Sequence, residues 1–205
     1  DFCEVSPQFG LAWRLSPEKT AYANVGRGYK AGGFNPVSPA NRESYGRESS
    51  WNYEIGAKTA WLDRRLSLNL ALFYIHWEDL QLNLPTGAPA QFYIANAGAA
   101  ASKGIELELN ARPLDGWDIF GSIGCTDARF LGGAMAGHTD AFGVDSLEDV
   151  GGRHLIYTPD FTANAGMQYA WKIHDETTVY ARAEAVFYGC YRYNPINSDG
   201  QDAYS

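Results

Sequence analysis

Apolar residues recur at every second position in seven segments of this chain, and this period constrains the fold more than any other feature. Successive side chains of a β-strand point to opposite faces of a sheet, so a period of two indicates strands, whereas helices repeat at three and four residues. Along the repeating positions no residue is charged, and only Thr59 and Gly121 are not apolar. The segments are residues 9–15, 51–61, 66–74, 105–111, 117–125, 161–171 and 179–187.

The positions between the apolar ones hold charges and amides, so each predicted strand has one apolar and one polar face. The charged residues are Arg14, Glu54, Lys58, Glu106, Glu108, Asp118, Arg182 and Glu184. The amide residues include Asn52, Asn69, Asn110, Asn164 and Gln168. An eighth segment, residues 20–31, is less regular because Arg27 interrupts its apolar positions, and its register stays open.

The connections between these segments alternate in length. Short polar turns fall at residues 16–19, 62–65, 112–116 and 172–176. Long links fall at residues 32–49, 84–95, 131–157 and from residue 190 onward. In an antiparallel meander this alternation places every short turn at one end of the sheet and every long loop at the other. We therefore predict an all-β fold, an antiparallel meander of about eight strands.

A sheet with one wholly apolar face must cover that face with a protein core or with lipid. No segment has the pattern of an amphipathic helix that could cover it, so lipid is the simpler cover. The strand at residues 51–61, at about 3.4 Å per residue and tilted about 45°, spans about 26 Å, close to the apolar band of an outer-membrane barrel. Aromatic rings at strand ends favour the membrane interface. These are Trp13, Trp51, Trp61, Tyr74, Trp117, Tyr169, Trp171 and Phe187.

Neither a soluble barrel nor a membrane-spanning helix fits the sequence as well as a lipid-facing sheet does. In a soluble barrel the apolar face would surround a small ligand, but such a barrel needs neither long loops at one end nor aromatic belts. A membrane-spanning helix is not expected, because the longest strongly apolar run, residues 66–77, is too short for one. The start of the chain also lacks the pattern of a signal peptide.

Charge and composition exclude several functions. Asp and Glu number 24 against 16 Lys and Arg, giving a net charge of −8, so the chain lacks the basic stripe needed to bind nucleic acid. The four histidines are scattered without ligand spacing, and no cysteine pair is close. We expect no metal site, no cofactor and no catalytic set of residues, and hence no enzyme.

Five segments carry recognisable motifs. They are residues 22–35 (YANVGRGYKAGGFN), 51–58 (WNYEIGAK), 70–75 (LALFYI), 96–98 with 103–113 (NAG and KGIELELNARP), and 157–164 (YTPDFTAN). In this order they resemble successive strands of TonB-dependent outer-membrane receptors. The resemblance covers nearly the whole chain, and the ordered set is far more specific than any single motif.

The resemblance implies an internal, late part of a transmembrane β-barrel of about 22 strands. Residues 1–205 would then be a partial barrel, without the plug domain that such receptors carry inside the barrel and without the last strands. It also implies a location in the outer membrane, uptake of a ferric siderophore or a similar scarce nutrient, and partners in outer-membrane lipid and in the TonB complex, which acts through the missing plug. We expect an open, curved sheet rather than a closed small barrel.

Two other functions are compatible with the sequence. A complete small outer-membrane barrel acting as an adhesin or a structural anchor is the main alternative, and a soluble ligand-binding barrel is the third.

Candidate ligand-binding residues lie where the second predicted strand runs into the first long link. Ferric siderophores are often anionic with flat aromatic groups, so cations and aromatic rings near the outer rim would suit them. These residues are Arg27, Tyr29, Lys30, Phe34, Arg42, Tyr45 and Arg47.

Overall fold

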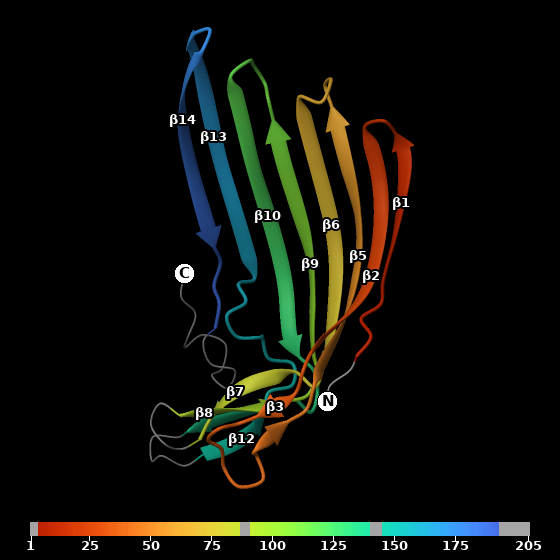
Figure 1. Cartoon of the computed structure of the whole chain (residues 1–205), viewed down its shortest axis with the longest axis vertical. Helices are drawn as coiled ribbons and strands as arrows, with labels where there is room; N and C mark the ends of the chain where they lie inside the picture. Colours follow the sequence, from red (N-terminus) through yellow and green to blue (C-terminus); the bar gives the residue numbers. More distant parts are fainter. Residues whose placement is uncertain (1–3, 87–90, 140–144, 193–205) are drawn as a thin grey trace.

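The computed structural model describes residues 4–86, 91–139 and 145–192 and consists of β-strands joined by turns and loops. Eight strands form one antiparallel sheet in the order β1-β2-β5-β6-β9-β10-β13-β14 (Figure 1). They are β1 (Gln8–Ser16), β2 (Lys19–Lys30), β5 (Glu48–Trp61), β6 (Leu66–Glu78), β9 (Ala100–Ala111), β10 (Trp117–Phe130), β13 (Phe161–His174) and β14 (Thr177–Tyr188). The predicted all-β meander of about eight strands is confirmed.

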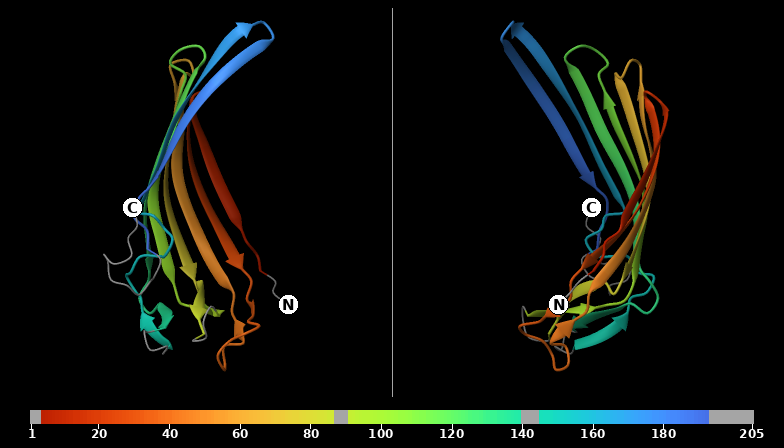
Figure 2. Two further views of the ribbon diagram at one scale, coloured as in Figure 1. Left: turned by 90° about the vertical axis from the view of Figure 1, so that its left-hand side faces the viewer. Right: turned by 45° about the vertical axis from the view of Figure 1, so that its right-hand side comes forward.

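The sheet is open and curved, as predicted. Its two edges are β1 and β14, which lie at opposite sides of the sheet. Along its length the described residues form a single layer (Figure 2). The short turns gather at one end and the long connections at the other, which confirms the alternation seen in the sequence. The described residues contain no helix of the length and apolarity that crossing a membrane requires.

Several strands continue farther toward the long connections than the apolar period predicts. The strand β5 begins at Glu48, β9 begins at Ala100 and β10 ends at Phe130, each several residues beyond the predicted segment. Backbone pairing continues in these extensions, as between Lys30 and Glu48. The period stops earlier because these residues lie beyond the apolar band, where neither face has to be apolar.

The structure settles the register of residues 20–31. Residues that face each other across antiparallel strands point to the same side of the sheet. Ala23 pairs with Leu11 of β1 and with Ile55 of β5, so the alternate residues of β2 share the apolar face. Arg27 pairs with Trp51 and therefore occupies the same face at its outer end.

The two faces of the sheet differ as expected. On the apolar face, Ile55, Leu72 and Ile105 lie side by side in the register and are 56%, 42% and 42% exposed. The other face carries Glu54 and Glu108 and is hollowed. Large apolar side chains with no protein packed over them would be unfavourable in water, so the apolar face is the one that contacts lipid.

Aromatic rings mark both ends of the apolar face. Near the short turns, Trp117 packs against Tyr169 at 5.0 Å between ring centroids. At the same end the Lys19 ammonium lies 4.0 Å from the ring centroid of Trp61. Near the long connections, the ring of Tyr53 lies 6.4 Å from that of Tyr74. Two aromatic belts separated by an aliphatic band are typical of a membrane-spanning sheet.

The long connections contain hairpins of their own. The connection from β2 to β5 pairs β3 (Gly33–Phe34) with β4 (Ser44–Tyr45), and that from β6 to β9 pairs β7 (Gln81–Pro85) with β8 (Phe92–Asn96). The connection from β10 to β13 pairs β11 (Met135–Thr139) with β12 (Asp145–Asp149). The sequence did not predict these hairpins, because strands of two to five residues are too short to show a period.

Rings on the inner face cover glycines of the neighbouring strand. The cross-strand pairs are Tyr22 with Gly56, Phe73 with Gly104, and Phe120 with Gly166. A Cβ atom at Gly56 would fall 2.5 Å from Tyr22, and one at Gly166 would overlap the Phe120 ring. These glycines therefore leave the space in which the rings lie flat against the sheet.

Replacement of the covered glycines should destabilise the sheet. We expect Gly56→Ala and Gly166→Ala to lower the free energy of unfolding by about 1–3 kcal/mol each, since the added methyl group displaces a ring. Gly26→Ala is the matched control, because the nearest atom to its Cβ would be Gln8 Cγ at 3.5 Å. Denaturant unfolding in detergent micelles measures the difference. Equal effects at all three positions would contradict this account.

Candidate functional site

The candidate ligand-binding residues all lie at the end of the sheet that carries the long connections (Figure 1). Arg27, Tyr29 and Lys30 end β2, whereas Phe34 belongs to β3 and Tyr45 to β4. Arg42 lies between β3 and β4, and Arg47 immediately precedes β5. The structure thus places these residues around one connection, but it divides them between different faces.

Arg27 and Arg47 both pair with Glu4. The Nη1 atom of Arg27 lies 3.3 Å from Glu4 Oε2, and Arg47 forms an ion pair with the other oxygen of the same carboxylate. The backbone N–H of Arg27 also donates to Pro7 O at 2.9 Å. These two arginines hold the segment before β1 against β2, and their contact with a ligand stays a prediction.

Tyr29 and Lys30 occupy opposite faces because they are adjacent in a strand. Tyr29 pairs with Ser49 and points to the same side as Arg27. Lys30 pairs with Glu48 and points to the side of the inner hollow. Of these two residues, Lys30 has the better orientation for a solute inside the barrel.

Two exposed aromatic rings lie where the first two long connections meet. The side-chain amide of Asn35 donates from Nδ2 to Ile94 O at 2.9 Å and accepts from Ile94 N at 2.9 Å. Phe34 precedes Asn35 and is 80% exposed, and Phe92 of β8 is 62% exposed. The sequence indicated Phe34 and missed Phe92, since the link containing Phe92 shows no period that would single out a ring.

Further amide side chains lock these two connections together. Asn96 Oδ1 accepts from Gly46 N at 2.7 Å, and its Nδ2 donates to Asp79 O at 2.8 Å. The buried Gln81 donates from Nε2 to Ala31 O and Gly46 O, both at 3.0 Å. Asn35, Gln81 and Asn96 thus substitute for backbone groups between two loops whose described strands form separate hairpins. We call these three residues the amide latch.

The third long connection joins the same unit through backbone bonds and apolar packing. Met135 N donates to Ala97 O at 2.7 Å, and Leu131 N donates to Ala99 O at 2.9 Å. The cluster beneath consists of Phe130, Ala134, Ala136 and Val150, with Leu80, Leu82 and Leu155 packed against it. The buried apolar core among the described residues therefore lies in the long connections and the strand ends next to them, whereas the sheet leaves its apolar face open.

The inner face of the sheet has a polar hollow of about 550 Å³. Its lining includes Glu54, Glu106 and Glu108 and a single lysine, Lys58. Glu108 accepts hydrogen bonds from Asn69 Nδ2 at 3.1 Å and from Asn110 Nδ2 at 3.2 Å. Carboxylates and amides on an open wall suit hydrogen bonding to a partner surface or to water. Among the described residues no three His, Cys, Asp or Glu side chains gather in a way that could hold a metal ion.

Comparison with known proteins identifies the family. The family described as "TonB dependent receptor-like, beta-barrel" matches residues 4–205 of this chain. The chain is 33% identical over 124 residues to the pesticin receptor of Yersinia pestis, an alignment that covers 58% of this chain and 18% of that protein. It is 30% identical over 122 residues to the ferripyoverdine receptor of Pseudomonas aeruginosa, covering 55% of this chain and 14% of that protein.

Solved structures show the same fold. The ferric yersiniabactin uptake receptor FyuA from Yersinia pestis superposes with a TM-score of 0.71 at 24% identity, covering 96% of this chain and 28% of that one. The siderophore receptor PiuA from Acinetobacter baumannii gives a TM-score of 0.69 at 21% identity, with the same two coverages. This chain therefore spans less than a third of each of these four proteins.

The sheet with one lipid-facing side, the polar inner wall and the gathered long loops define a segment of an outer-membrane receptor barrel. The family match extends over almost every residue, so the chain belongs to the TonB-dependent receptor β-barrel family. Members of this family are outer-membrane proteins of Gram-negative bacteria, and the location predicted from the sequence is confirmed.

The amide latch predicts how the loops respond to substitution. Asn96→Ala removes the acceptor of Gly46 N and the donor to Asp79 O, so we expect hydrogen exchange of the Gly46 amide to accelerate about 5- to 30-fold, corresponding to about 1–2 kcal/mol of lost local stability. Hydrogen–deuterium exchange read by mass spectrometry measures this. Asn110→Ala is the control, because that amide bonds to Glu108 on the sheet. If the Gly46 amide exchanges at the same rate in both variants, the amide latch does not stabilise this connection.

Proposed function

We propose that this chain forms part of the wall of an outer-membrane transporter that imports a ferric siderophore or a similar scarce nutrient. The observation that carries the proposal is the division of one sheet into a lipid-facing side and a polar inner side, with the long connections folded together at one end. The relatives and structural neighbours, a ferripyoverdine receptor and a ferric yersiniabactin uptake receptor among them, support this substrate class.

Residues 1–205 are proposed to be a partial barrel, with a plug domain and further strands supplied by the rest of a longer protein. The polar hollow lies on the side where a plug would sit, and its three carboxylates offer acceptors to such a domain. The TonB complex would act on the plug, so energy enters the transporter outside the strands described here. We assign this chain no catalytic step.

A complete small barrel, acting as an adhesin or an anchor, fits the structure less well. Closure would require β1 to pair with β14, whereas these strands form the two edges of a sheet that stays open. In hydrocarbon each unpaired backbone group costs several kcal/mol, so both edges need neighbouring strands.

The long connections that the amide latch joins are proposed to contact the ligand. Phe34 and Phe92 offer exposed rings to flat groups of a ligand, and Lys30 and Arg42 offer positive charge to its anionic groups. The hydroxyl group of Tyr45 comes close to Gly33, the residue before Phe34, so Tyr45 lies beside this surface. The rim around this surface is formed by Arg27, Tyr29 and Arg47. Of these, Arg27 and Arg47 would influence ligand binding through the segment before β1, which they hold by their ion pairs with Glu4.

Uptake measurements test the import function. The full-length receptor is expressed in a strain without its own siderophore receptors, and uptake of radioactive iron is measured with a panel of catecholate, hydroxamate and mixed ferric siderophores. We expect uptake of at least one complex, and we expect it to vanish in a strain that lacks TonB. Uptake that persists without TonB, or no uptake of any complex by a correctly inserted receptor, would contradict the proposal.

The aromatic pair is tested with the complex that the panel identifies. Phe34→Ala and Phe92→Ala should each weaken binding about fivefold, the equivalent of about 1 kcal/mol of lost ring contact, and leave the amount of receptor in the membrane unchanged. Tyr180→Ala is the matched control, because Tyr180 is 67% exposed, between Phe92 and Phe34, but lies close to the short-turn end of the sheet. Identical affinities for all variants would remove the two rings from the ligand site.

A further inference from the structure

Three charged residues of β9 and β10 interrupt the lipid-facing side of the sheet just beyond its outer aromatic belt. Lys103 of β9 pairs with Tyr74 on one side and with Asp127 of β10 on the other. Residues paired in this way share a face, so Lys103 and Asp127 point outward in the same row as Tyr74 and Tyr53. Arg129 lies two residues after Asp127 on the same strand and also points outward.

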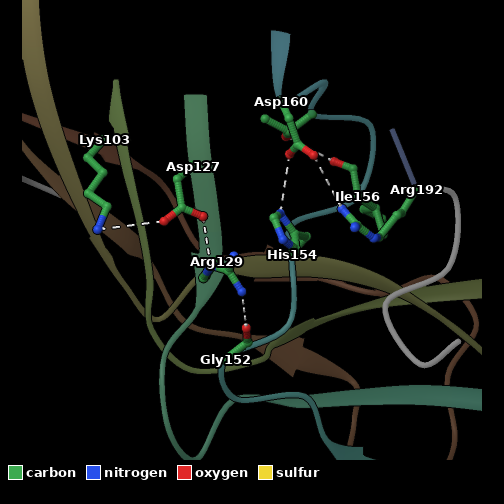
Figure 3. A network of polar contacts seen from close by, with 9 residues as sticks. Lys103, Asp127, Arg129, Gly152, His154, Ile156, Asp160 and Arg192 are labelled. Atoms are coloured by element: carbon green, nitrogen blue, oxygen red, sulfur yellow. Dashed lines mark hydrogen bonds and ion pairs between the residues drawn. The ribbon is translucent and has the colours of Figure 1, made fainter. Parts of the chain in front are cut away.

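The contacts leave positive charge in this cluster (Figure 3). The Lys103 Nζ atom lies 3.6 Å from Asp127 Oδ2, and Arg129 Nε lies 2.6 Å from Asp127 Oδ1. One carboxylate thus serves two cations. Arg129 Nη1 also donates to Gly152 O at 3.0 Å, which fixes the guanidinium beside Asp127. The side chains of Lys103 and Arg129 are 67% and 45% exposed.

A second carboxylate extends the network. His154 Nδ1 lies 3.3 Å from Asp160 Oδ1, and Arg192 Nη1 lies 4.0 Å from Asp160 Oδ2. Since His154 also forms a β-bridge with Arg129, the two halves are adjacent. Lys103 and Arg129 carry two positive charges and share one negative charge, that of Asp127. The excess charge of these three residues is therefore positive.

The position of this cluster determines what it meets. Toward the short turns the same face continues with Leu72 and Ile105, which contact hydrocarbon, and toward the other end the strands lead into the long connections. The rings of Tyr53 and Tyr74 mark the interface, so Lys103 and Arg129 stand at the depth of the lipid headgroups. Cations on the outer wall at that depth attract the anionic groups of lipids.

We propose that Lys103 and Arg129 form a binding site for the phosphate headgroup of an anionic lipid in the outer leaflet. Asp127 orients both cations, and Arg129 can present two N–H donors to phosphate oxygens while it keeps its bond to Gly152. The proposal rests on the outer-membrane placement of the sheet given above. It goes beyond that placement by assigning a lipid contact to a particular side of β9 and β10.

Lipid titration of the full-length receptor in detergent tests the site. The probe is diphosphoryl lipid A, with dephosphorylated lipid A as the reference and binding read by thermal shift. We expect Lys103→Gln to weaken binding of the phosphorylated lipid about fivefold and to leave binding of the reference unchanged. Lys103→Arg, which keeps the charge, should bind like the unmodified receptor. If Lys103→Gln and Lys103→Arg weaken binding of the phosphorylated lipid equally, the proposal is overturned.

Lys172→Gln is the matched control for position. Its side chain is also 67% exposed and pairs with a single aspartate, Asp175 at 3.4 Å, but it lies at the short-turn end of the sheet. Loss of lipid binding in this variant would indicate general attraction between charges and would overturn the site. Competition by inorganic phosphate at the same concentration as the lipid would indicate a site for free anions and would overturn it as well. Lipid binding is measured without ligand uptake, so a receptor that imports iron but shows no difference between the lipids would refute this inference alone.

Discussion

The pairing of backbone N–H and C=O groups between neighbouring strands is the interaction on which the rest of this structure depends. Hydrocarbon offers these groups no partner, so a strand that faces lipid must be bonded along both edges. The sheet meets this requirement between every pair of neighbours from β1 to β14. Each residue's face follows from that register, and with it the division into a lipid-facing and an inner side.

The register also explains how small residues are used on the inner face. Where Tyr22, Phe73 and Phe120 lie across from glycines, the rings rest on the neighbouring backbone instead of projecting into the hollow. Space for a polar interior is kept in this way, and the rings add contact between neighbouring strands on the inner face. The apolar atoms of this face therefore strengthen the wall without filling it.

The sequence predicted the sheet well because burial in lipid acts on every second residue. The period located all eight strands and the apolar face, and only the register of residues 20–31 had to wait for the pairing of Ala23 with Leu11 and Ile55. It did not predict the strand extensions or the loop hairpins, because beyond the apolar band no single solvent selects one face. It also could not foresee that Glu4 would engage Arg27 and Arg47, since that contact joins positions distant in sequence.

The amide latch has a consequence for the design of chimeric receptors. The connection between β2 and β5 contributes Asn35 and the carbonyl groups of Ala31 and Gly46, whereas the connection between β6 and β9 contributes Gln81, Ile94 and Asn96. A graft that replaces only one of them would leave the other with amides that have lost their counterparts. Recognition elements on these two connections can therefore be transplanted between scaffolds only as a set.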